Sequence, residues 1–69
     1  MNDIARKIKV ITMDKGMNLH DLAEKAGYKY ETLSVKMSRG IKSIEDLNHL
    51  LDSLDCDMVF VDRSTKKVY

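Results

Sequence analysis

The chain has 69 residues, a mass of 7.9 kDa and a formal net charge of +1, and 43% of its residues are hydrophobic and 33% charged. This length allows one domain with one small core, which excludes a multi-domain enzyme. The longest apolar run is the four residues 58–61, which excludes a membrane span and a secretory signal. The single cysteine, Cys56, and the lack of an export signal lead us to expect a cytoplasmic protein.

Positive charge is concentrated in the first part of the chain. Residues 1–42 contain nine Lys or Arg against five Asp or Glu, a net charge of +4. Residues 43–69 contain three basic residues against six acidic ones, a net charge of −3. A domain polarised in this way is suited to presenting one face to a polyanion.

The periodicity predicts four amphipathic helices in a single domain, over residues 3–15, 19–26, 30–38 and 44–54. Their apolar residues recur at spacings of three and four, as on one face of a helix. These stripes are Ile4, Ile8 and Ile11; Leu19, Leu22, Ala23 and Ala26; Leu33 and Met37; and Leu47, Leu50, Leu51 and Leu54. Asn18 and Ser43 are suitable N-caps for the second and fourth helices, and Gly16, Gly27 and Gly40 follow the first three.

The pattern changes after Asp57. The four residues Met58, Val59, Phe60 and Val61 are β-branched or large and apolar, which predicts a strand that is buried on both faces. Residues 62–65 are typical of a turn, and residues 66–69 are expected to return as a second strand. A lone strand needs a neighbour, so 58–61 is predicted either to fold back as a hairpin over 58–69 or to form the dimer interface with a second subunit.

A helix-turn-helix is predicted where the second and third helices meet. Ala23 is small enough for the third helix to approach closely, and Gly27 can adopt the left-handed backbone that the tight turn requires. Leu33 is expected to fill the corner from the third helix.

These residues resemble the lambda-repressor-like helix-turn-helix regulators of the Cro/CI or XRE family. The resemblance covers about residues 4–56 and is carried by Leu22–Gly27, by Thr32-Leu33-Ser34 and by Leu54-Asp55-Cys56. It implies a mainly α, four-helix domain of the small phage or mobile-element type, which acts as a homodimeric repressor and reads an operator in double-stranded DNA with its third helix. The chain departs from the family pattern at Leu19, Lys29 and Lys36, where the family more often has a glutamine, a Ser or Thr cap and an apolar anchor.

In this geometry the first residues of the third helix reach base edges. Tyr30, Glu31 and Ser34 are the predicted base contacts, with Val35 and Ser38 as further outward positions. The predicted phosphate contacts are Asn18, Lys29, Lys36, Arg39 and Lys42. Two alternatives remain open: Tyr30 covers the edge of the core, or Glu31 only complements the helix dipole.

Other chemistry has little support in the sequence. His20 and His49 are far apart and lack a third ligand at helical spacing, so no metal or other cofactor is expected. Nothing resembles a nucleophile turn or a carboxylate pair, so we expect neither an enzyme nor a small-molecule site. The alternative function is a protein-interaction module of the same fold, such as an antitoxin that binds its partner through the strand 58–61.

Overall fold

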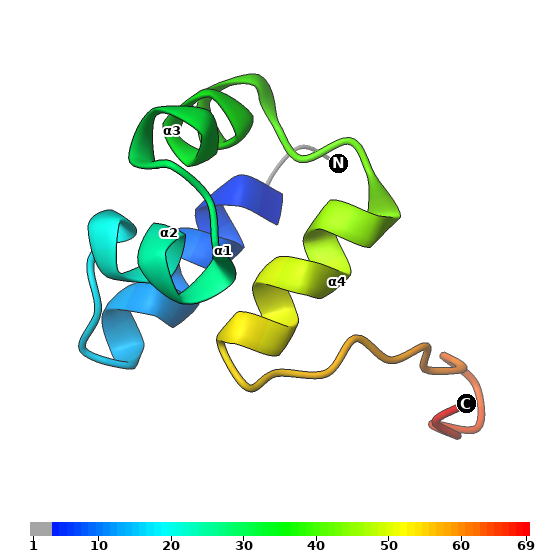
Figure 1. Cartoon of the computed structure of the whole chain (residues 1–69). Helices are drawn as coiled ribbons and strands as arrows, with labels where there is room; N and C mark the ends of the chain where they lie inside the picture. The colour runs from blue at the N-terminus through cyan, green and yellow to red at the C-terminus, as the bar shows by residue number, and fades with distance from the viewer. Residues whose placement is uncertain (1–3) are drawn as a thin grey trace.

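The computed structural model describes residues 4–69, which form four helices and a C-terminal arm, residues 55–69 (Figure 1). The helices are α1 (Ile4–Asp14), α2 (Leu19–Ala26), α3 (Tyr30–Arg39) and α4 (Ile44–Ser53). Each bound lies within one residue of the expectation, apart from the expected start at Asp3, which lies outside the described residues.

Local side-chain bonds explain where two of the helices begin. Asn18 Oδ1 accepts a hydrogen bond from the Asp21 N–H at 2.9 Å, and Asp21 Oδ2 accepts one from the Asn18 N–H at 3.0 Å, so α2 has a complete capping box. Ser43 Oγ accepts from the Asp46 N–H at 3.3 Å and caps α4. Lys29, which precedes α3, makes no side-chain cap bond.

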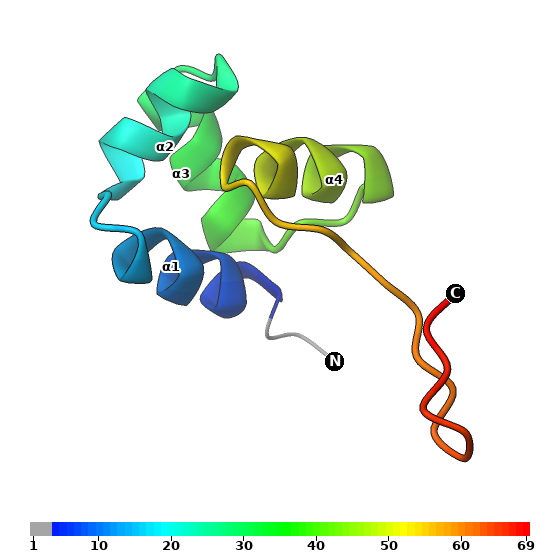
Figure 2. The ribbon, with the colours of Figure 1, turned by 90° about the horizontal axis from the view of Figure 1, so that it is seen from below.

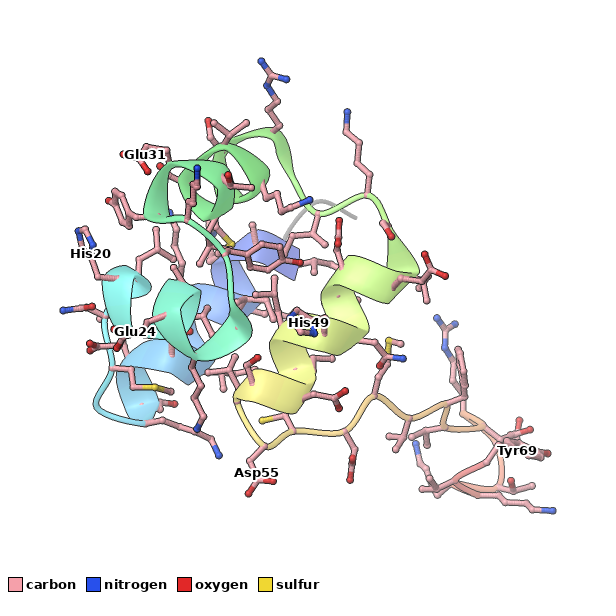
Figure 3. All side chains as sticks on the ribbon, in the orientation of Figure 1. His20, Glu24, Glu31, His49, Asp55 and Tyr69 are labelled. Atoms are coloured by element: carbon pink, nitrogen blue, oxygen red, sulfur yellow. The ribbon has the colours of Figure 1, made fainter. Side chains whose placement is uncertain are left out.

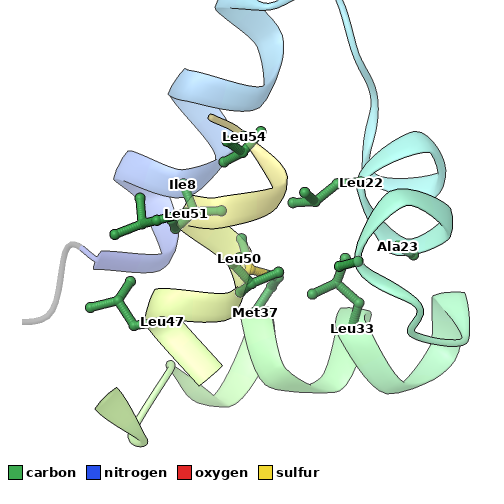
Figure 4. Packing of buried hydrophobic residues seen from close by; sticks show 10 residues of the cluster. Ile8, Leu22, Ala23, Leu33, Met37, Leu47, Leu50, Leu51 and Leu54 are labelled. Atoms are coloured by element: carbon green, nitrogen blue, oxygen red, sulfur yellow. The ribbon is translucent and has the colours of Figure 1, made fainter. Parts of the chain in front are cut away.

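The helices enclose one apolar core, with α2 packed against α1, α3 and α4. Figure 4 shows Leu22, Leu33 and Leu50 pointing into the space between α2, α3 and α4. The buried residues are Ile8, Leu22, Ala23, Ala26, Leu33, Met37, Leu47, Leu50, Leu51 and Leu54. The buried hydroxyl of Thr12 donates to the Ile8 carbonyl at 2.6 Å, so it has a hydrogen-bond partner within α1. The predicted apolar stripes therefore account for most of this core.

The strand predicted at 58–61, buried on both faces, is not found within the single chain. Within residues 4–69 no β-strand forms, and the expected hairpin is reduced to a single antiparallel bridge between Val61 and Val68. The arm leaves the end of α4 and extends away from the helices (Figure 2), so Phe60 remains 70% exposed. An apolar run folds into a buried strand only where other elements cover it, and here the helices contact Met58 but leave Val59, Phe60 and Val61 exposed.

The turn of the arm is nevertheless well defined. Asp62 Oδ1 accepts from the N–H groups of Ser64 and Thr65 at 2.8 and 3.1 Å, and these bonds lower the pKa of the Asp62 carboxyl. Lys66 has a φ of 62°, which turns the chain back. The arm lengthens the molecule to 41 × 23 × 18 Å. None of the described helices is long and apolar enough to cross a membrane.

Candidate nucleic-acid interface

The corner between α2 and α3 is built as a tight helix-turn-helix. Gly27 has a φ of 80°, and the following N–H, that of Tyr28, donates to the Ala23 carbonyl at 2.9 Å. This pattern ends α2 in a left-handed residue and lets α3 begin only three residues later. Ala23 and Leu33 are both buried at the contact between the two helices.

The rotation of α3 follows from its two buried residues, Leu33 and Met37. Residues on the opposite side of the helix face solvent, and Val35 lies at the centre of that side with 47% of its surface exposed. Glu31 and Thr32 are exposed on either side of it, and Figure 3 shows Glu31 pointing away from the helical body. Ser34 is only half-buried, at the flank of this face.

Thr32 is therefore an outward residue of α3 that the expected set of base contacts leaves out, whereas Val35, expected as a further outward position, lies at the centre of the exposed face. The sequence itself indicates the outward position of Val35, because Leu33 and Met37 at i and i+4 place it on the far side of a helix. An apolar side chain at such a position is suited to contact the methyl group of thymine.

Tyr30, at the start of α3, does not point freely outward. Its ring stacks on the ring of His20, with centroids 3.7 Å apart and an angle of 6° between the planes. Both side chains are exposed, so the stack lies on the surface where α2 and α3 begin. Sequence reasoning missed the role of His20, because nothing in the spacing of residues 20 and 30 indicates this contact.

Lys36, which was predicted to contact phosphate, points instead toward α4. Its Nζ donates to Asp46 Oδ2 at 2.9 Å, and the two side chains are 31% and 34% exposed. The hydrogen bond from Lys36 lowers the pKa of the Asp46 carboxyl, and the same bond raises the pKa of Lys36. Its position on α3, next to the inward Met37, directs the long side chain along the body of the protein rather than away from it.

Asp46 also holds the turn. The Tyr28 hydroxyl donates to Asp46 Oδ1 at 3.1 Å, and partial burial together with this bond raises the pKa of Tyr28. The ring of His49 meets Tyr28 edge-on, with centroids 5.6 Å apart. His49 Nε2 lies 2.6 Å from the Ala26 carbonyl, which can only accept, so this nitrogen carries the proton. The cluster of Tyr28, Lys36, Asp46 and His49, which we call the turn cluster, connects the helix-turn-helix to α4.

The other predicted phosphate contacts divide into two kinds. Lys29, Arg39 and Lys42 are exposed, before α3, at its end and in the loop that follows. Asn18, in contrast, uses its side-chain oxygen to cap α2, and the Asp21 carboxylate lies beside it. That negative charge opposes the binding of a phosphate at this helix start.

A family model, described as a Cro/C1-type HTH DNA-binding domain, matches residues 7–59. The chain belongs to this family. The match includes the whole helix-turn-helix and α4 and stops within the C-terminal arm, so the Cro/C1-type model does not extend over residues 60–69. No curated protein and no solved structure was found to match the chain.

Membership of the Cro/C1-type family makes the exposed face of α3 the candidate DNA-reading surface. The arm lies at the other end of the molecule, as the positions of Glu31 and Tyr69 in Figure 3 show.

Proposed function

We propose that this protein is a homodimeric repressor in the cytoplasm that reads an operator in double-stranded DNA with α3. The observation that carries the proposal is the exposed outer face of α3 within a domain of the Cro/C1-type family. In a helix-turn-helix the second helix of the motif enters the major groove, and its first residues contact base edges. Repression requires no further activity, since a protein bound at an operator obstructs the DNA by occupying it.

The base contacts come from the outward residues of α3. Glu31 can accept a hydrogen bond from cytosine N4, and Ser34 can bond either to a purine or to a pyrimidine. Val35 is exposed and can contact thymine methyl groups, and Tyr30 can offer its hydroxyl from the stack with His20.

Affinity comes from exposed cations on both sides of α3: Lys29 before it, and Arg39 and Lys42 after it. Such residues bind phosphates and set the register of the protein on the duplex, whatever the sequence. Lys36 is not among them, because its ammonium is paired with Asp46.

The test is the salt dependence of binding to random duplex DNA. We expect Arg39→Ala and Lys42→Ala each to reduce the slope of log affinity against log salt by about one unit, because each removes about one phosphate contact. Lys67→Ala, on the arm, makes the same change of charge and is expected to leave the slope unchanged. Val35→Ala and Ser34→Ala are expected to change which operator is preferred, with the slope intact.

The alternative, a protein-interaction module such as an antitoxin, is favoured by one observation, the exposed apolar side chains of the arm. It predicts no salt-dependent binding to duplex DNA even at about 50 mM salt. That result would overturn the regulator.

A further inference from the structure

The C-terminal arm presents an unpaired backbone edge. Tyr69 N–H donates to the Phe60 carbonyl at 2.9 Å, and Asp62 N–H donates to the Lys67 carbonyl at 2.8 Å. These bonds use the side of the 58–61 segment that faces the return segment. Because neighbouring residues of an extended strand point their backbone groups to opposite sides, the N–H and C=O groups of Val59 and Val61 lie on the outer edge. Among residues 4–69 these groups have no backbone partner.

The arm is also too small to be stable alone. A two-stranded hairpin is at best marginal in water, and here one bridge holds the pair. Five large apolar side chains of the arm are at least half exposed, namely Val59, Phe60, Val61, Val68 and Tyr69. An open edge with apolar faces favours pairing with another strand.

We propose that the outer edge of residues 59–61 pairs antiparallel with the same edge of a second copy, with the two-fold axis between the two Phe60 side chains. The inference rests on the proposed homodimer and specifies its register. The N–H and C=O groups of Val59 bond to those of Val61 of the second copy, and the reverse. The two Phe60 residues then form a non-hydrogen-bonded pair, whose Cα atoms lie about 4.5 Å apart.

Three observations select this register. It places residues 59–61 of one copy opposite residues 59–61 of the other, so Phe60 faces Phe60 and each valine faces a valine. An axis at Val61 would instead set Phe60 opposite the charged Asp62. An axis at Val59 would set Met58 opposite Phe60, but the Met58 side chain packs against the helical core.

The outer edge of the return segment is the poorer one for pairing. It offers the backbone groups of Val68, while the left-handed Lys66 bends the chain and Lys66 and Lys67 directly precede Val68. Lysines on an edge oppose strand addition.

Pairing through 59–61 joins two hairpins into a four-stranded sheet, with Val59, Val61 and Val68 of both copies on one face and Phe60 and Tyr69 on the other.

Backbone amide exchange of the wild-type chain tests the pairing, with light scattering on the same samples. We expect a dimer in which the Val59 and Val61 amides become protected as the concentration rises, whereas those of Asp62 and Tyr69 are already bonded within one chain. A dimer whose Val59 and Val61 amides exchange freely would overturn the inference and leave the DNA-binding proposal intact. A chain that is monomeric both free and on DNA would overturn both the inference and the homodimer.

Single cysteines in a Cys56→Ala background test the register. Phe60→Cys is expected to form an intermolecular disulfide on mild oxidation, because a disulfide needs Cα atoms within roughly 7 Å. Val59→Cys and Val61→Cys are the matched controls. In this register each cysteine lies too far from the same cysteine of the second copy to form a disulfide. Crosslinking through Val59→Cys or Val61→Cys, with none through Phe60→Cys, would overturn the proposed axis.

The contribution of the facing side chains is measured through dimer dissociation. Phe60→Ala is expected to weaken the dimer roughly tenfold, since it removes an aromatic pair. Ile44→Ala, an exposed apolar residue of α4, is the control and is expected to have no effect. Equal effects of Phe60→Ala and Ile44→Ala would count against the interface.

Discussion

At the scale of single residues, two side chains act on α3 from other helices. His20 of α2 covers one face of the Tyr30 ring, and Asp46 of α4 holds the ammonium of Lys36. One contact orders a side chain that we propose to contact bases, and the other pairs a cation of α3 with α4. Both leave a residue of α3 with fewer accessible orientations than a free surface side chain has.

We expect His20→Ala to change operator preference at the same base pairs as Tyr30→Ala. The stack holds the Tyr30 hydroxyl in place, and aromatic pairs contribute about 0.5–1.5 kcal/mol. A double-mutant cycle of operator affinity measures this coupling. Lys25→Ala, an exposed change on the same helix, is the control. Additive effects of His20→Ala and Tyr30→Ala would show that the stack has no role in binding.

Asp46→Asn is expected to lower the melting temperature at neutral pH, because it removes the partner of Lys36 and weakens that of Tyr28. The pKa of Asp46 is lowered in the folded chain, so its stabilisation is present above the ordinary carboxyl pKa and is lost as the pH falls through the lower folded value. The difference in melting temperature between the wild type and the variant should therefore shrink below about pH 4. Asp52→Asn is the control on the same helix, and a difference independent of pH would contradict the ion pair.

At the scale of elements, the turn between α2 and α3 decides where α3 begins and how it packs against α2. Gly27 is left-handed, and a Cβ built on it meets no atom within 4 Å. Position 27 therefore needs glycine for its backbone conformation and not because a larger side chain would clash. The turn cluster then connects the helix-turn-helix to α4.

Gly27→Ala is expected to destabilise the fold by about 1 kcal/mol, because alanine disfavours the left-handed region. Thermal unfolding should show a fall of about 4–8 °C for a chain of this size. Gly27→Asn is the control, because asparagine tolerates this conformation and should cost less. Equal losses for the two variants would point to a cause other than backbone conformation.

At the scale of the whole molecule, the helices and the arm are separate in space. The helical body carries the candidate DNA surface, and the arm extends away from it (Figure 2). Asp57 and Asp62 lie on the arm, so pairing through the arm would keep these two charges away from the DNA.

A homodimer predicts a two-fold operator. Selection from random duplexes should return inverted half-sites whose centres lie about 34 Å apart, or a multiple of that, since each α3 enters the major groove on the same face of the DNA. Footprinting of the selected sites checks the spacing. A single, unrepeated half-site bound by one chain would contradict the dimer on DNA.

The sequence by itself determined the four helices, most of the core and the helix-turn-helix corner. Their signals are local: stripes at three and four residues, the cap at Asn18, and a glycine where the backbone turns left-handed. Such features depend on residues a few positions apart, so they can be read along the chain.

Only the tertiary structure decided what Lys36, Tyr30 and the arm do. Lys36 meets Asp46 ten residues later, and Tyr30 meets His20 ten residues earlier, so no periodicity relates the partners. The arm was expected to be a buried strand, but whether an apolar run is buried depends on what covers it, and the helices already fill their core with their own side chains.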